Sequence, residues 1–352
     1  MANFNTMCPN HAGSAAGPVA WLRADPREWP PGTLDRERLY AAAQQLAGQA
    51  AHAQAARKLA AEVLRSLEEV PVAKRVVHDT PIYILLVFCM YLHHVRDRTD
   101  PRSGVTLKAL RTLFAARGTD SFAGDSHIRD MLAWCRNRGL LQQVVPAQAT
   151  GDRRVRPLEP TPLLVDMFQH WVRAFLRGSA DVLPPPLPPD RLPAPELVCE
   201  VLACRIRCHV RENFTPTERF PLIQEFMLRK HGYHVFLTLV EAMRPDGQGA
   251  SAPVTVSALA QRFKIARATV RNALGPAEQR GLLALRGADG AVHLAPEFVQ
   301  LSLQWMAFEA TYMHGIIQVA AHAVRHAGEQ AVSGGTQGSG RSPTSPRAPG
   351  AA

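Results

Sequence analysis

The sequence predicts a mainly α-helical protein with small β-hairpins, in which the same small unit occurs twice. Most segments repeat apolar residues every three or four positions, as amphipathic helices do. The same order of helix, turn and hairpin signals occurs in residues 77–178 and again in residues 196–326. The chain has 352 residues and is 46% apolar, which is enough for more than one folded unit and excludes a chain disordered throughout.

The ends of the chain differ in composition from its middle. Residues 1–32 are interrupted by Gly and Pro, and residues 327–352 contain few apolar side chains, so we expect a disordered arm and a disordered tail. Residues 33–76 are rich in Ala and carry a thin stripe of Leu and Val, which predicts one or two helices. These helices either pack on their own domain or form a dimerisation surface, and the sequence favours neither.

The first unit, residues 77–178, contains five predicted elements. In order they are an apolar helix over 81–95, an amphipathic helix ending at Gly118, a second helix over 126–138, a β-hairpin around Gly151 and Asp152, and a helix over 160–171. Seven prolines between Pro184 and Pro195 then predict an extended linker over 179–195, which marks a domain boundary.

The second unit, residues 196–326, repeats this order. Its elements are an apolar helix over 235–243, an amphipathic helix after Thr255, a second helix over 268–279, a hairpin over 286–290, and a long helix from Pro296 to about Arg325. The sequences Arg138-Gly139-Leu140-Leu141 and Arg280-Gly281-Leu282-Leu283 end the second helix in each unit and lie 142 positions apart. In both, the glycine is expected to cap the helix.

The long final helix has a pattern of its own. Phe298, Trp305, Tyr312 and Val319 recur every seven residues, a spacing that suits packing against another helix. This helix either closes the two units on each other, as an intramolecular pseudo-dimer, or joins two chains in a homodimer.

Helix, turn, helix, glycine cap, hairpin and helix is the order of a winged helix-turn-helix domain, so we expect two such domains in tandem. The stretch Ala266-Arg267-Ala268-Thr269-Val270-Arg271-Asn272 resembles the recognition helix of GntR-type bacterial repressors. The stretch Gly151-Asp152-Arg153-Arg154-Val155-Arg156 is similar to the basic wing of MarR-type regulators. These resemblances imply a DNA-binding transcriptional regulator of the bacterial cytoplasm and nucleoid, and MarR-type proteins pair through terminal helices.

The basic charge of the chain lies in the two repeated units. The formal net charge is +10. Residues 81–178 hold 14 basic and 8 acidic side chains, and residues 219–326 hold 11 and 7, so the excesses of 6 and 4 equal the whole net charge. This distribution is expected if each unit faces a polyanion.

The second helix of each unit is the candidate for contact with DNA bases. In the second unit its polar face holds Arg267, Thr269, Arg271 and Asn272. Arg pairs with guanine, Asn pairs with adenine, and a Thr near the helix start contacts a phosphate.

In the first unit the corresponding polar face holds Ser126, His127, Arg129 and Arg136. Asp130 interrupts this face. Its carboxylate either accepts a hydrogen bond from cytosine or pairs with a neighbouring arginine, and we favour the pair. The hairpins add Arg153, Arg154 and Arg156 in the first unit and Arg286 in the second, where they reach the sugar-phosphate backbone or the minor groove.

We therefore expect a sequence-specific protein of double-stranded DNA that acts as a transcriptional regulator. Two alternatives remain: a plasmid or phage replication initiator that binds origin repeats, and a protein–protein interaction scaffold built from winged helices. No motif for a catalytic site or a cofactor stands out. Cys199, Cys204 and Cys208 do not all share one helix face, so they do not indicate a metal site. The longest apolar run, residues 82–92, is too short to cross a membrane, and the scattered cysteines suit a reducing compartment.

Overall fold

The computed structural model describes residues 36–77, 79–97, 100, 103–115, 124–144, 157–211, 214–245, 250–288 and 290–335. The fold is mainly helical with two small antiparallel sheets, as the sequence predicts. The expected arm, residues 1–32, lies outside the described residues.

The segment before the first unit is helical. It forms α1 (Arg36–Ala47), α2 (His52–Glu69) and the short α3 (Pro71–Val77). The apolar side chains of α2 are buried inside the chain, where α2 packs against helices of both repeated units. Other helices of the same chain therefore cover the apolar stripe of α2.

The first unit contains α4 (Thr80–His94), α5 (Leu107–Ala115), α6 (Asp125–Asn137), β1 (Leu141–Gln143), β2 (Leu158–Pro160) and α7 (Pro162–Ser179). Strands β1 and β2 pair in antiparallel fashion, with Leu141 opposite Pro160, and Val105 forms one further bridge to Leu158. Helix α7 extends beyond Trp171, where the sequence analysis ends it, because its apolar spacing continues through Phe175 and Leu176.

The second unit contains α8 (Pro195–Arg211), α9 (Pro221–Leu228), α10 (Gly232–Ala242), β3 (Arg244–Pro245), β4 (Ala250–Thr255), α11 (Val256–Phe263), α12 (Arg267–Gln279), β5 (Leu283–Arg286), β6 (Ala291–Leu294) and α13 (Pro296–Gly335). The strands form one sheet in the order β3-β4-β6-β5. Strand β4 pairs with β6, as Val105 pairs with Leu158 of β2 in the first unit.

The two units share hydrogen bonds as well as element order. Thr106 and Thr255 cap α5 and α11, since their Oγ1 atoms accept hydrogen bonds from the amides of Ala109 at 3.1 Å and of Ala258 at 3.0 Å.

The ends of α6 and α12 match in the same way. Gly139 and Gly281 follow these helices with φ of 69° and 68°, in the left-handed region that favours glycine. The amide of the next residue donates to the helix in both, from Leu140 to Cys135 O at 3.0 Å and from Leu282 to Ala277 O at 2.9 Å. The sequence repeat is therefore a structural repeat.

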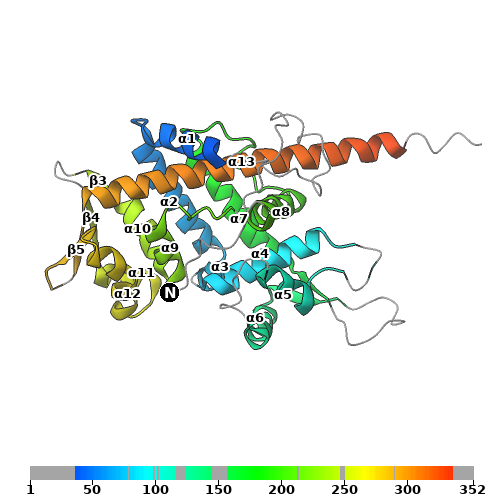
Figure 1. The fold of residues 1–352 in the computed structure, drawn as a ribbon, viewed down its shortest axis with the longest axis horizontal. Helices are drawn as coiled ribbons and strands as arrows, with labels where there is room; N and C mark the ends of the chain where they lie inside the picture. The colour runs from blue at the N-terminus through cyan, green and yellow to red at the C-terminus, as the bar shows by residue number, and fades with distance from the viewer. Residues whose placement is uncertain are drawn as a thin grey trace, which may run out of the picture.

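Both units pack on one continuous apolar core, which extends from Leu39 to Ala321. Helix α2 contacts α7 of the first unit and α10 of the second, and α8 contacts α4, α7 and α13 (Figure 1). Residues 180–194 contain no helix or strand, as expected for a proline-rich segment, but the apolar cores on either side of them are joined.

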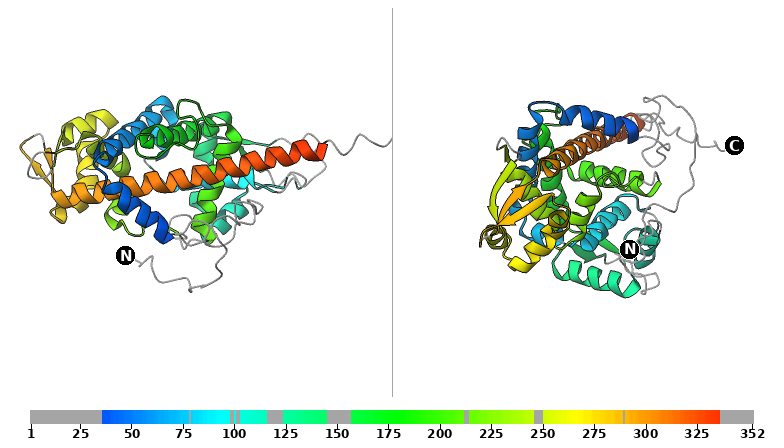
Figure 2. Two further views of the ribbon diagram at one scale, coloured as in Figure 1. Left: turned by 90° about the horizontal axis from the view of Figure 1, so that it is seen from above. Right: turned by 60° about the vertical axis from the view of Figure 1, so that its left-hand side comes forward.

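Helix α13 crosses the length of the body and projects past it (Figures 1 and 2). It ends at Gly335, so the prediction of a disordered tail from residue 327 is wrong for residues 327–335. Ala327, Glu329, Gln330 and Ala331 are good helix formers, which explains why the helix continues past residue 326. Residues 336–352 lie outside the described residues.

Candidate nucleic-acid interface

Helix α6 divides cleanly into a buried and an exposed face. Ile128, Met131 and Cys135 are buried in the core. The predicted contact residues lie on the other face: Ser126, His127, Arg129 and Arg136 are all exposed. The 3.6-residue period of a helix separates these two sets, so the packing of the apolar face turns the polar face outward.

Contacts with neighbouring groups fix the two ends of α6. At its start, Arg111 Nε of α5 lies 2.8 Å from Asp125 Oδ1. At its end, the guanidinium of Arg138 lies 5.5 Å from the centre of the Trp134 ring. Burial and the nearby charge of Asp79 raise the pKa of the Cys135 thiol to about 12, so the thiol stays protonated inside the helix packing.

Asp130 is exposed and makes no ion pair with any residue that the structure describes. The expected pairing of Asp130 with a neighbouring arginine is therefore not found among the described residues. The carboxylate is left as an open acceptor on the polar face of α6.

Helix α12 has the same division. Val270, Ala273 and Leu274 are buried, and Arg267, Arg271 and Asn272 are exposed. Thr269 is half-buried at the edge of the exposed face, and its amide donates to Ala266 O at 2.9 Å.

The two helices also begin alike. Gly124 and Ala266 occupy the N-cap positions of α6 and α12, and neither helix has a side-chain cap. The preceding helix α11, in contrast, is capped by Thr255. The first-turn amide groups of α6 and α12 therefore lack the side-chain acceptor that satisfies a capped helix.

Among the described residues, the exposed arginines on these faces lack the ion pairs that two arginines next to α12 form. Arg262 and Arg280 flank α12 but pair with Glu241 and Glu225, at 2.6 and 2.5 Å. Within the described part of the chain, no ion pair or side-chain hydrogen bond involves the following five arginines: Arg129, Arg136, Arg267, Arg271 and Arg286. These cations remain available to an external anion.

The β5–β6 hairpin places Arg286 at its outer end. Gly287 and Gly290 have φ of 70° and 65°, which forms the tight turn. A Cβ at Gly290 would lie 2.9 Å from Val256 Cγ2, so the hairpin packs closely on the start of α11. Arg286 is exposed there.

In the first unit, Arg153, Arg154 and Arg156 lie outside the described residues, and the structure places only the base of that hairpin, β1 and β2.

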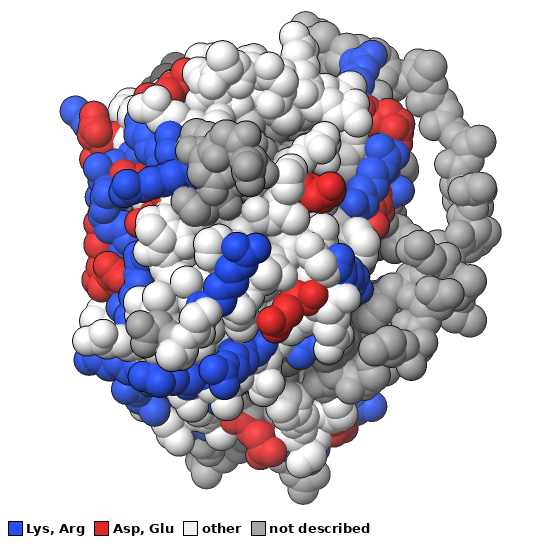
Figure 3. All heavy atoms as spheres, turned by 90° about the vertical axis from the view of Figure 1, so that its left-hand side faces the viewer, with Lys and Arg blue, Asp and Glu red and all other residues white. Residues whose placement is uncertain are grey.

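Helices α6 and α12 lie on one side of the molecule (Figure 1). Helices α6 and α12 both lie on the side away from α13 and α1, at the bottom of Figure 1 and of the right-hand view of Figure 2. Figure 3 shows Lys and Arg side chains gathered in a band across the lower part of the end that carries α12 and the β5–β6 hairpin.

Lys264 was missed by the sequence analysis. It joins α11 to α12 in the left-handed conformation, with φ of 54°, and it is exposed. A basic residue three positions before Arg267 was the available signal, but nothing in the sequence indicates that the turn presents this side chain on the same side as Arg267.

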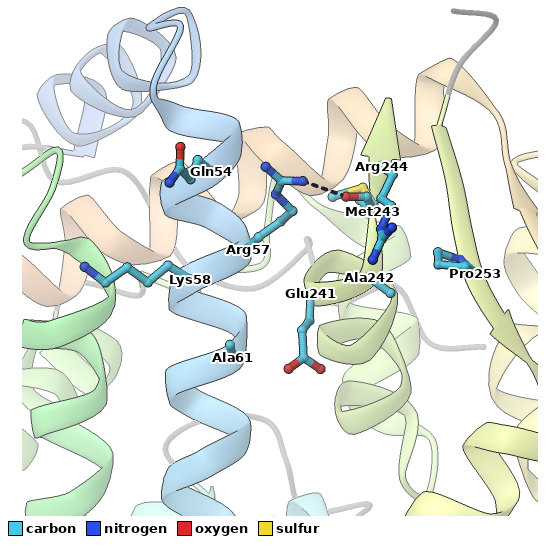
Figure 4. Close-up of a pocket in the computed structure, with 9 residues that line it drawn as sticks. All are labelled: Gln54, Arg57, Lys58, Ala61, Glu241, Ala242, Met243, Arg244 and Pro253. Carbon is cyan, nitrogen blue, oxygen red and sulfur yellow. Dashed lines mark hydrogen bonds between the residues drawn. The ribbon is translucent and has the colours of Figure 1, made fainter. Parts of the chain in front are cut away.

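A groove of about 540 Å³ lies between α2 and the end of α10 (Figure 4). Its lining residues are Gln54, Arg57, Lys58, Ala61, Glu241, Ala242, Met243, Arg244 and Pro253. Arg57 Nη1 donates to Met243 O at 3.1 Å across it. The sequence analysis did not find this groove, because segments far apart in the chain form it.

No group of three or more His, Cys, Asp or Glu residues in the described ranges is arranged to hold a metal ion. No helix among them is long and apolar enough to span a bilayer. Comparison with known proteins found no matching family model, no matching curated protein and no matching solved structure.

Proposed function

We propose that the chain binds double-stranded DNA in a sequence-specific manner through α6 and α12, as two winged helix-turn-helix domains, and regulates transcription. One observation carries the proposal. A repeated unit presents, twice and on one side of the molecule, a helix whose exposed face carries arginines that have no acidic partner among the described residues.

The arrangement of each unit suits the major groove. A recognition helix needs an apolar face that anchors it and a polar face that reaches base edges. In α12, Arg271 and Asn272 are adjacent and exposed, and they supply donors for guanine and both a donor and an acceptor for adenine. In α6, Arg129 supplies donors for guanine, and the open carboxylate of Asp130 can accept from the amino group of cytosine.

The helix starts suit the phosphate backbone. The first-turn amides of α6 and α12 have no side-chain cap, and the helix dipole adds partial positive charge there. Arg286 at the end of β5 and Lys264 in the turn before α12 add exposed cations next to the recognition face. These groups would fix the position of the domain on DNA, while the α6 and α12 side chains would select the sequence.

The experiment is selection of bound sequences from a random duplex pool, followed by binding assays on the selected duplex and on a scrambled one. Three variants of the full chain are compared with the wild type: Arg267→Ala/Arg271→Ala, Arg129→Ala/Arg136→Ala and Arg153→Ala/Arg154→Ala. We expect each recognition-helix variant to lose about 1–3 kcal/mol per base contact on the selected duplex and little on the scrambled one. The hairpin variant should weaken binding to both duplexes equally.

A matched control removes the same charge elsewhere. Lys58, which is half-buried, and Arg65, which is exposed, lie on α2 and pair with Asp181 and Glu62, outside both recognition helices. Lys58→Ala/Arg65→Ala should keep the preference for the selected duplex. If the recognition-helix variants behave like this control, the assignment of the two faces is wrong.

The same data separate the alternatives. An interaction scaffold would show no salt-dependent binding to duplex DNA. A replication initiator would bind DNA as well, and mapping the bound sites on the genome distinguishes origin repeats from promoters.

A further inference from the structure

We infer that one copy of this chain recognises a composite DNA site made of two different half-sites at a fixed spacing. The inference rests on the proposed function. One chain would occupy a single asymmetric DNA site, whereas a symmetric dimer would occupy a palindrome. Three structural features carry it.

The first feature is the close packing of α7, from the first unit, on α2. A Cβ at Gly178 of α7 would lie 2.6 Å from the Cα of Leu59 in α2, so the two helix backbones are in direct contact there. The first unit is therefore fixed on one side of α2.

The second unit is fixed to the same helix. Helix α10 packs on α2, and Arg57 donates to the carbonyl oxygen of Met243 at the end of α10. His52 at the start of α2 is hydrogen-bonded through Nε2 to Leu303 O of α13, at 2.9 Å. Both units are thus attached to one helix by buried contacts, and the distance between α6 and α12 is a property of the folded body.

The proline-rich segment does not act as a free tether. Gln169 of α7 donates to Pro193 O at 2.6 Å, which holds the segment against the first unit. Helix α8, which follows it, joins α4 through a partly buried hydrogen-bonding contact in which His94 Nε2 lies 2.6 Å from Glu200 Oε2. A flexible tether would accept a range of half-site spacings, whereas a rigid body accepts one.

The second feature is that the heptad stripe of α13, the surface that the sequence offers for a homodimer, is used inside the chain. Phe298, Trp305, Tyr312 and Val319, which recur every seven residues along α13, are all buried. They lie on a helix that packs against α1, α2 and α8 of the same chain. The stripe that would have suited a homodimer instead holds the two units together.

The third feature is the difference between the two recognition faces. Helix α6 presents Arg129 beside the carboxylate of Asp130, and α12 presents Arg271 beside the amide of Asn272. A carboxylate accepts hydrogen bonds only, whereas an amide donates and accepts, so the two faces select different bases. The two half-sites should therefore not be inverted copies of each other.

The test uses the selected duplex and the full chain. Insertion of 5 base pairs between the half-sites turns one of them to the opposite side of the DNA, and insertion of 10 base pairs returns it to the same side one helical turn further away. We expect both insertions to lower affinity at least tenfold, to the level of one unit alone. We also expect one chain per duplex by sedimentation.

Protein variants test the asymmetry. Arg129→Ala/Arg136→Ala should relax sequence preference in one half-site only, and Arg271→Ala/Asn272→Ala in the other only. These four side chains are exposed, so the variants should fold as the wild type does.

Several results would overturn the inference while leaving DNA binding intact. They are a palindromic selected sequence, two chains per duplex, full affinity after insertion of 10 base pairs, or a variant that affects both half-sites equally. Absence of specific duplex binding by the wild type would instead refute the proposed function itself, and the composite site with it.

Discussion

Ionisation of Glu200 stabilises the contact between α8 and α4 of the first unit. Its carboxylate is buried and lies 2.6 Å from His94 Nε2 and 2.9 Å from Arg207 Nη1. Burial alone would raise the pKa of Glu200, but the hydrogen bonds and charges of His94 and Arg207 outweigh it and hold the pKa below its ordinary value. The charged form is therefore the one that stabilises the fold.

We predict that Glu200→Gln lowers the free energy of unfolding by about 3 kcal/mol at pH 7, because it removes one charge of a buried ion pair. A carboxylate with a lowered pKa in the folded state contributes its stability above its unfolded pKa and loses it as the pH falls through the folded value. The difference between wild type and variant should therefore shrink once the pH falls below about 4.3. Urea unfolding at pH 7 and at pH 3.5 measures it, and a difference that does not change with pH would contradict this role.

The sequence predicted which side of α6 and of α12 is exposed but not which cations have partners. Helical periodicity placed Arg129, Arg136, Arg267 and Arg271 outward, and they are exposed. The pairing of Arg280 with Glu225 joins α9 to the end of α12, and no local pattern links residues from two different helices. Tertiary contacts decide which charges are left for a ligand.

The glycine caps of α6 and α12 test whether the two units repeat the same structure. Gly139 and Gly281 have the same left-handed conformation, and no atom lies within 4 Å of a Cβ placed at either. We predict that Gly139→Ala and Gly281→Ala each cost about 1 kcal/mol, since the penalty is conformational and not steric.

Asparagine at the same positions supplies the control for this pair. Asn adopts the left-handed conformation more readily than alanine does, so Gly139→Asn and Gly281→Asn should each cost less than the corresponding alanine variant. Urea unfolding of the four variants decides the matter, and an alanine cap variant as stable as the wild type would show that its helix ends differently from its counterpart.

Regular elements were predictable where a strong local signal exists. The bounds of α6 and α12 lie within one residue of the predicted ones. Apolar spacing defines these helices locally, and a glycine cap marks the end of each. Helix α9 and strand β3 were not predicted, since eight residues and two residues carry too little periodicity. The place of α2 between the two units depends on close approaches such as that of Gly178 to Leu59, which only the folded structure brings about.

For the whole molecule, one continuous core makes a prediction about cooperativity. Because α2, α8 and α13 pack against one another and against helices of both units, neither unit can unfold without exposing apolar surface of the other. We predict a single unfolding transition in urea, with coincident curves from far-ultraviolet circular dichroism and from tryptophan fluorescence. Two separate transitions would show that the units are independent domains.

Leu59→Ala extends this prediction. Leu59 is buried at the contact of α2 with α7, so the substitution should cost about 2–5 kcal/mol. In one cooperative body this loss should lower hydrogen-exchange protection in both units. A loss confined to the first unit would contradict the shared core.

We propose that the two exposed basic faces bind duplex DNA, and the decisive measurement is the salt dependence of binding. If the wild type neutralises about five to eight phosphates, the logarithm of its association constant should fall with the logarithm of salt concentration at a slope of about −5 to −7. Arg153→Ala/Arg154→Ala, which removes two cations expected at phosphates, should make that slope shallower, whereas Lys58→Ala/Arg65→Ala should not. A wild-type slope near zero, or the same slope in all these proteins, would contradict the claim.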